Sequence, residues 1–119
     1  MHEYVKKMNL DKYTEVVFDI ERERIIAIAE KMQALDENAY MNGYNWEAFL
    51  NCYLAKMSPD LLEGMQTDPE AGMYVAYYDL SPANELKAAK FAEVICDLVE
   101  NEKKIYSFLR EHGAEIAWD

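Results

Sequence analysis

The sequence predicts a single small α+β domain, in which four to five helices pack on a small, mostly antiparallel sheet. Three observations predict this class. The chain has 119 residues, which is the length of one domain, and neither a linker nor an internal repeat divides residues 1–119. Two segments have the alternation and the β-branched or aromatic content of strands, and the other apolar segments have the helical period. Because strands and helices do not alternate regularly, α+β fits better than a wound parallel sheet.

The first predicted elements are a strand over residues 14–20 and a helix over residues 23–35. In the strand, Val16, Phe18 and Ile20 share one face, as alternate residues of an extended chain do. The helix repeats apolar residues three and four positions apart, which is the amphipathic pattern. Residues 36–44 follow neither period and contain the turn signal Asn42-Gly43.

A second helix is expected after Asn45, which is a suitable capping residue. Its apolar face is the most regular in the chain and consists of Trp46, Phe49, Leu50, Tyr53, Leu54 and Met57. Ser58-Pro59 predicts that a short helix restarts there, because Pro fits the first helical turn. Residues 67–72 are expected to form a turn.

The second strand is predicted over residues 73–79, where apolar bulk on both faces indicates a central or well-covered strand. Ser81-Pro82 repeats the capping signal and begins a long helix that is expected to end near residue 99. Asn101 is the expected cap of a last helix, and Gly113 is the expected left-handed C-terminal cap. Residues 114–118 could add a short edge strand.

The most unusual property of the composition is its charge. Twelve Lys and Arg stand against 23 Asp and Glu, which gives a net charge of −11. Such a chain lacks the basic face that binding to nucleic acid or to an anionic membrane requires, so neither is an expected partner. Nine acids and one base lie in residues 36–85, so this segment carries −8 of the total. Two interpretations remain open, namely chance combined with solubility, or an acidic face for a cationic partner.

The residues of common catalytic and metal sites are scarce, so no catalytic residue, metal ligand or cofactor is predicted. The two histidines, His2 and His112, are not spaced with a nucleophile, and the four glycines form no phosphate-binding loop. Cys52 and Cys96 fit no zinc pattern and are expected to be buried free thiols. The N-terminus has no apolar run of a signal peptide and no segment is long enough to span a membrane, so a cytoplasmic protein is expected.

Tyrosine is abundant, with nine residues in the chain. Tyrosine is enriched at protein interfaces because it offers a large rigid contact area with one polar tip. Tyr53 and Tyr77 fit a core packed with aromatic side chains. Tyr40 and Tyr44 lie on the acidic loop and fit an interface better.

Two segments resemble the recurrent motifs of the immunity protein 51 family. Asn42-Gly43-Tyr44-Asn45-Trp46-Glu47 is similar to the family signature N-G-Y-x-W-E, although the family more often has Asp where this chain has Asn45. Asp68-Pro69-Glu70-Ala71-Gly72-Met73 resembles the second recurrent block, and the resemblance extends over about residues 14–112. It implies a non-enzymatic immunity protein of a bacterial polymorphic toxin or contact-dependent growth inhibition system. Such proteins are encoded beside a toxin, which is often a nuclease, and bind its C-terminal toxic domain in the cytosol.

The leading hypothesis is therefore an acidic, tyrosine-containing face that neutralises a basic toxin domain by occupying a site built for phosphate. The candidate toxin-binding residues are Asp36, Glu37, Tyr40, Tyr44, Glu47, Asp68 and Glu70. The motif residues expected to serve the scaffold are Gly43, Trp46, Pro69 and Gly72, with Gly43 permitting a turn and Trp46 anchoring the helix start. Two alternatives remain, a small carboxylate-based enzyme that could use Mg²⁺ and a general acidic adaptor protein.

Overall fold

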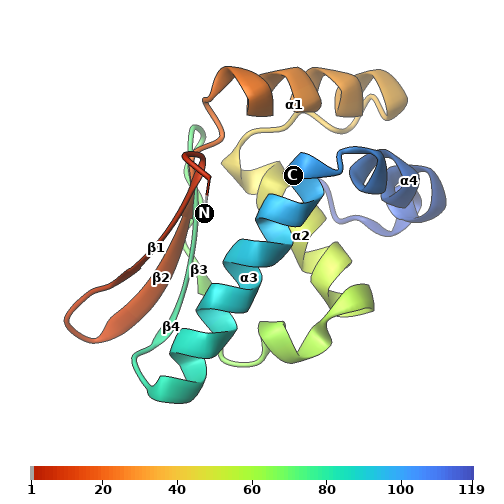
Figure 1. The fold of residues 1–119 in the computed structure, drawn as a ribbon. Helices are drawn as coiled ribbons and strands as arrows, with labels where there is room; N and C mark the ends of the chain where they lie inside the picture. Colours follow the sequence, from red (N-terminus) through yellow and green to blue (C-terminus); the bar gives the residue numbers. More distant parts are fainter. Residues whose placement is uncertain (1) are drawn as a thin grey trace.

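A computed structural model describes residues 2–119 and confirms the predicted class, with helices packed on a four-stranded antiparallel sheet (Figure 1). The strands are β1 (Val5–Asn9), β2 (Tyr13–Phe18), β3 (Gln66–Thr67) and β4 (Tyr74–Asp79). The helices are α1 (Glu23–Leu35), α2 (Gly43–Met57), α3 (Pro82–Glu100) and α4 (Lys103–His112), with the short 3-10 helices η1 (Pro59–Leu62) and η2 (Gly113–Glu115). None of the helices formed by residues 2–119 combines the length and the hydropathy needed to cross a lipid bilayer.

The sheet has the strand order β1-β2-β4-β3, and every neighbouring pair is antiparallel. The two predicted strands, β2 and β4, form its centre; the two-residue β3 was not predicted, and neither was β1. The β1 sequence, VKKMN, shows little apolar alternation. This is common in edge strands, because one edge of the strand is exposed and Lys is typical there. Its backbone pairs with β2 from Val5 opposite Phe18 to Asn9 opposite Thr14.

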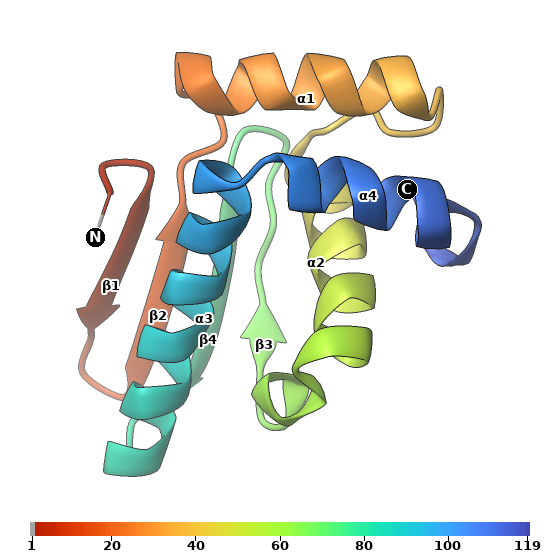
Figure 2. The same cartoon turned by 45° about the vertical axis from the view of Figure 1, so that its right-hand side comes forward.

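Helices α2 and α3 cover one face of the sheet, and α1 lies across the end of this layer (Figures 1 and 2). Aromatic side chains join the layers: Phe18 of β2 packs edge to face against Trp46 of α2, with ring centres 5.0 Å apart. Tyr74 of β4 similarly meets Phe91 of α3 at 6.2 Å. The core therefore lies between one sheet face and the helices, as the alternating and helical patterns require.

The helix caps differ in part from the prediction. Asn42, not Asn45, caps α2, and its side chain accepts a hydrogen bond from the Asn45 backbone at 2.9 Å. Asn45 lies inside the first turn, where its buried side chain donates to the Tyr40 carbonyl at 2.8 Å. Ser81 caps α3 as predicted, through a 3.1 Å bond from the Asn84 backbone. Either asparagine could begin α2 from sequence alone, and the tertiary packing of Asn45 decides between them.

Two further cap predictions were wrong or only partly correct. Asn101 ends α3 rather than beginning α4, and its side chain donates to the Asp97 carbonyl and carboxylate. The restart at Ser58-Pro59 produces only η1, a single 3-10 turn, and the Ser58 side chain makes no cap bond.

The C-terminal segment also corrects the prediction. Gly113 has φ of −54°, which is right-handed, and it begins η2 instead of forming a left-handed cap. Residues 114–118 form no strand, because the side chain of Glu115 contacts α2 and α4 and none of these residues pairs with a sheet edge. The Glu115 carboxylate binds Lys56 of α2 at 2.8 Å, and Ile116 is buried in the core.

Candidate functional site

The start of α2 packs closely on the turn that joins β3 to β4. The Gly43 backbone donates to the Ala71 carbonyl at 3.0 Å. A Cβ atom on Gly43 would lie 1.8 Å from the carbonyl oxygen of Glu70 and 2.3 Å from that of Met73, distances that carbon atoms do not tolerate. The first family-like motif therefore lies directly against the second, and glycine is the residue that permits the approach.

Glu47 lies on α2 one turn after Gly43. Its half-buried carboxylate accepts a hydrogen bond from the Thr67 hydroxyl of β3. The buried Tyr74 hydroxyl lies near this charge, and burial first, with the Glu47 charge second, raises the pKa of Tyr74 above its usual value. Glu47 therefore connects α2 to β3 and lies close to β4, and these two strands flank the second motif.

A hollow of about 730 Å³ lies between α2 and the C-terminal segment. Two contacts hold the C-terminal segment against α2, the Lys56–Glu115 ion pair at 2.8 Å and a 2.6 Å hydrogen bond from the Asp119 backbone to the Asn45 side chain. The hollow is lined by Tyr44, Glu47, Ala48, Asn51, Cys52, Ala55, Lys56, Glu115, Ala117, Trp118 and Asp119. Three carboxylate side chains against one lysine make this concavity acidic, and it is large enough for the side chains of a partner protein.

The predicted toxin-binding residues lie on several surfaces. Tyr44 and Glu47 share the large hollow. Tyr40 is 65% exposed and lines a second hollow of about 290 Å³ between α1 and the 71–72 turn. Asp68 lines a small hollow on the face of the sheet that α2 and α3 do not cover, whereas Thr67 beside it points to Glu47. Glu47 and Asp68 therefore lie on opposite faces of the sheet, because consecutive strand residues alternate.

The other predicted acids lie at segment ends. Asp36 follows α1, where its carboxylate accepts a bond from the Asn38 backbone at 3.0 Å and lies close to Gly113. Glu37 beside it is exposed. Glu70 is exposed in the turn before β4, where its backbone pairs with that of Met73.

The motif residues expected to serve the scaffold lie where the elements meet. Trp46 is 1% exposed, and its ring contacts Phe18 of β2 and Phe49 of its own helix. Pro69 is half-buried in the turn between the strands. Gly72 lies beside the Glu21 carboxylate, which a Cβ atom would meet at 3.0 Å.

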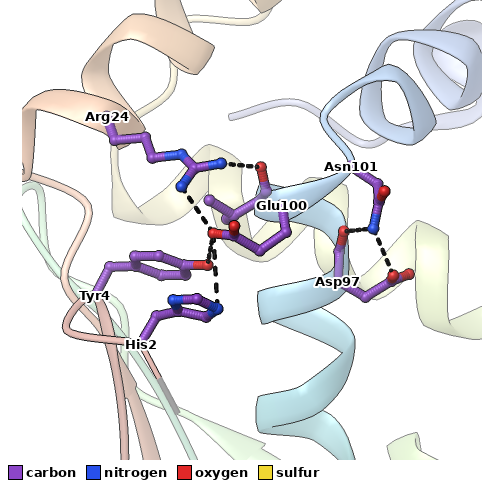
Figure 3. Close-up of polar contacts among 7 residues, drawn as sticks. His2, Tyr4, Arg24, Asp97, Glu100 and Asn101 are labelled. Atoms are coloured by element: carbon purple, nitrogen blue, oxygen red, sulfur yellow. Dashed lines mark hydrogen bonds and ion pairs between the residues drawn. The ribbon is translucent and has the colours of Figure 1, made fainter.

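A separate polar cluster joins the turn before β1 to α1 and α3 (Figure 3). The Tyr4 hydroxyl donates to the Glu100 carboxylate at 2.7 Å, and the Arg24 guanidinium pairs with the same carboxylate at 2.8 Å. Arg24 also donates to the Val99 carbonyl at 3.3 Å, and His2 lies 3.8 Å from Glu100. The hydrogen bond from Tyr4 and the charge of Arg24 hold the pKa of Glu100 below its usual range. The cluster thus stabilises a charged carboxylate at a junction of three elements.

The alternative of a carboxylate enzyme calls for grouped acids with raised pKa values. The carboxyl groups whose pKa departs clearly from its usual value, Glu100, Glu102 and Glu115, are all shifted downward by hydrogen bonds from neighbouring side chains. Within residues 2–119 no three His, Cys, Asp or Glu side chains are grouped as metal ligands.

Cys52 and Cys96 are free as predicted, but both are half-buried rather than fully buried.

No sequence pattern indicated that Lys56, Glu115 and Trp118 line the hollow of about 730 Å³. No local signal could have found them, because the ion pair joins residues far apart in the chain. Trp118 is half-buried in the hollow wall, and its indole nitrogen has no hydrogen-bond partner among residues 2–119.

Comparison with known proteins identifies the family. Neither the curated protein sequences nor the solved structures compared with the chain gave a match. The family model described as immunity protein 51 matches residues 5–114, which is nearly the whole chain and includes both motifs and all four strands. The family indicates an immunity function with a toxin as partner, and it is consistent with a non-enzymatic role. From β1 to the end of α4, this chain belongs to the immunity protein 51 family.

Proposed function

We propose that this protein binds the C-terminal domain of its cognate toxin in the cytosol and neutralises it without catalysing a reaction. The toxin belongs to a polymorphic toxin system such as contact-dependent growth inhibition, and its toxic domain is a basic nuclease. The family match over residues 5–114 is the observation that carries this proposal. The family match implies a toxin partner, which this protein must recognise through its own folded surface.

The charge of the chain supports the basic character of the partner. The net charge is −11, and several predicted contact residues, including Glu37, Tyr40, Tyr44, Asp68 and Glu70, have exposed side chains. A nuclease carries Lys, Arg or His where it holds phosphate, so carboxylates can occupy the same positions and exclude nucleic acid. Opposite charges also accelerate the encounter, by roughly 10- to 1000-fold at low salt.

Binding and neutralisation can be tested with the gene next to the one that encodes this chain. The C-terminal domain of its product is co-expressed with this protein, and co-purification is measured together with degradation of DNA and RNA by the free and bound domain. We expect a stable complex and loss of nuclease activity. A domain that does not co-purify, or that remains fully active in the complex, contradicts the proposal.

Salt tests the electrostatic part separately. Raising the ionic strength from about 0.01 M to about 1 M shortens the screening length from about 30 Å to about 3 Å. The association rate constant is therefore expected to fall steeply, while the dissociation rate constant changes much less. An association rate that is independent of salt would show that charge does not steer the encounter.

A further inference from the structure

The strand register divides the sheet into two faces of different character. In the two central strands, the side chains that face α2 and α3 are all buried, namely Thr14, Val16, Phe18, Tyr74, Ala76 and Tyr78. The intervening side chains point the other way and form what we call the open sheet face, Tyr13, Glu15, Val17, Val75, Tyr77 and Asp79. The sheet therefore has one face in the core and one face outside it.

No helix formed by residues 2–119 covers the open sheet face, because all of them lie on the other side of the sheet in both views (Figures 1 and 2). The face is nevertheless rich in apolar and aromatic groups. Tyr13 is 39% exposed and Met8 of the neighbouring strand 37%, while Val17, Val75 and Tyr77 are half-buried. An uncovered sheet face of this composition is typical of an interaction surface.

The open sheet face places aromatic rings beside carboxylates. The rings of Tyr13 and Tyr77 meet edge to face with centres 5.2 Å apart. Beside them is a hollow of about 180 Å³, into which Glu15 and Asp68 also reach. Neither carboxylate has a salt bridge or a side-chain hydrogen bond among the described residues, so both can receive donors from a partner.

The charge of the open sheet face favours some binding partners over others. Asp79 adds a third acid opposite Tyr13, and the base Lys6, opposite Val17, offsets only one of the three. Two copies of this chain that met through this face would bring these carboxylates together, which disfavours a homodimer. A cationic side chain is favoured, because ammonium and guanidinium groups interact with both carboxylates and aromatic rings.

We propose that the open sheet face is the docking surface for the toxin domain and that it receives an arginine of that domain. The guanidinium lies over the Tyr13 and Tyr77 rings and donates to Glu15 and Asp68, and Val17 and Val75 form the apolar surround. This inference rests on the proposed function and adds the place and the chemistry of contact. Arginine and tyrosine are also the residues most enriched at the energetic centres of protein interfaces.

The test compares two charge-matched double variants in binding to a catalytically inactive form of the neighbouring gene's C-terminal domain. Glu15→Gln with Asp68→Asn removes the two carboxylates of the open sheet face. Glu30→Gln with Glu93→Gln removes two exposed carboxylates from α1 and α3, which also lack salt bridges and side-chain hydrogen bonds within residues 2–119. Both variants change the net charge equally, so they lose the same long-range attraction.

We expect the sheet-face variant to raise the dissociation constant by about 100-fold, since each of the two groups at an interface centre contributes about tenfold. The control variant should change it by less than about threefold, as rim charges do. Tyr13→Leu, which leaves all charges in place, should also weaken binding by about tenfold. Thermal unfolding of each variant shows that it is folded, and none of the changed side chains is buried.

The outcomes separate the two proposals. If the wild-type protein binds but both double variants bind equally well, the docking surface is elsewhere and the proposed function stands. If the wild-type protein does not bind the domain at all, the proposed function is overturned, and this inference with it.

Discussion

The substitution Gly43→Ala tests whether the two family-like motifs are held together by a close approach of their backbones. The added Cβ would lie 1.8 Å from the Glu70 carbonyl oxygen and 2.3 Å from that of Met73. Backbone atoms cannot rotate away as a side chain can. The turn must therefore retreat from α2 by more than 1 Å before the nearer contact reaches even 3.0 Å. That retreat breaks the 3.0 Å hydrogen bond from Gly43 to Ala71.

The expected cost follows from these contacts. Overpacking costs about 1–3 kcal/mol, and the lost hydrogen bond about 1 kcal/mol. Alanine recovers about 0.5–1 kcal/mol through its better helix propensity. The net loss is therefore about 1–3.5 kcal/mol, which lowers the midpoint of thermal unfolding by about 4–14 °C in a domain of this size.

Gly72→Ala is the matched control, because it adds the same methyl group to the second motif. Its Cβ would meet the Glu21 carboxylate at 3.0 Å, but that group is the end of an exposed, flexible side chain and can move. We expect a shift of only about 2 °C or less, as for most exposed substitutions. Calorimetry or circular dichroism measures both midpoints. A Gly43→Ala midpoint within about 3 °C of the wild type would show that the two backbones are not in close contact, since even the smallest cost above corresponds to about 4 °C.

Other substitutions test contacts of the core and of the polar cluster. Tyr78→Phe removes a buried hydroxyl that donates to a backbone carbonyl, and it should lower the free energy of unfolding, measured by chemical denaturation, by about 1–2 kcal/mol. Tyr74→Phe removes a buried hydroxyl that has no partner among residues 2–119, so it should be neutral or stabilising. Equal effects of the two would be inconsistent with this account. Asn42→Ala should cost about 1 kcal/mol through the lost cap, and a neutral result would argue that the cap is dispensable. Glu100→Gln should destabilise the protein at pH 7, because folding lowers the pKa of this carboxyl, chiefly through the hydrogen bond from Tyr4. The charged carboxylate therefore contributes to stability above its unfolded pKa of about 4.3, and this contribution is lost as the pH falls through its folded pKa. The difference between wild type and variant should then shrink from pH 7 to pH 3, and a constant difference would contradict the sign.

The local patterns of the sequence were sufficient for much of the fold. Alternation identified β2 and β4, the helical period identified α1 to α4, and Ser81-Pro82 marked the start of α3. These signals succeed because the period of a pattern states which side chains must turn inward, whatever they pack against. They failed for β1 and the two-residue β3, edge strands with little apolar alternation, and for residues 114–118, whose Glu115 pairs with α2 and α4.

The arrangement of the surface could not be obtained in this way. The acidic segment 36–85 is continuous in sequence, yet the fold separates Glu47 in the large hollow from Asp68 on the other side of the sheet. It also brings Tyr13 and Glu15 beside Tyr77, although they lie in distant parts of the chain. Composition and local patterns were enough to predict the class of the fold, the acidity and the two family-like motifs. Which charged groups share a surface depends on the folded chain, because strand pairing and alternation, not nearness in the chain, place side chains on a face.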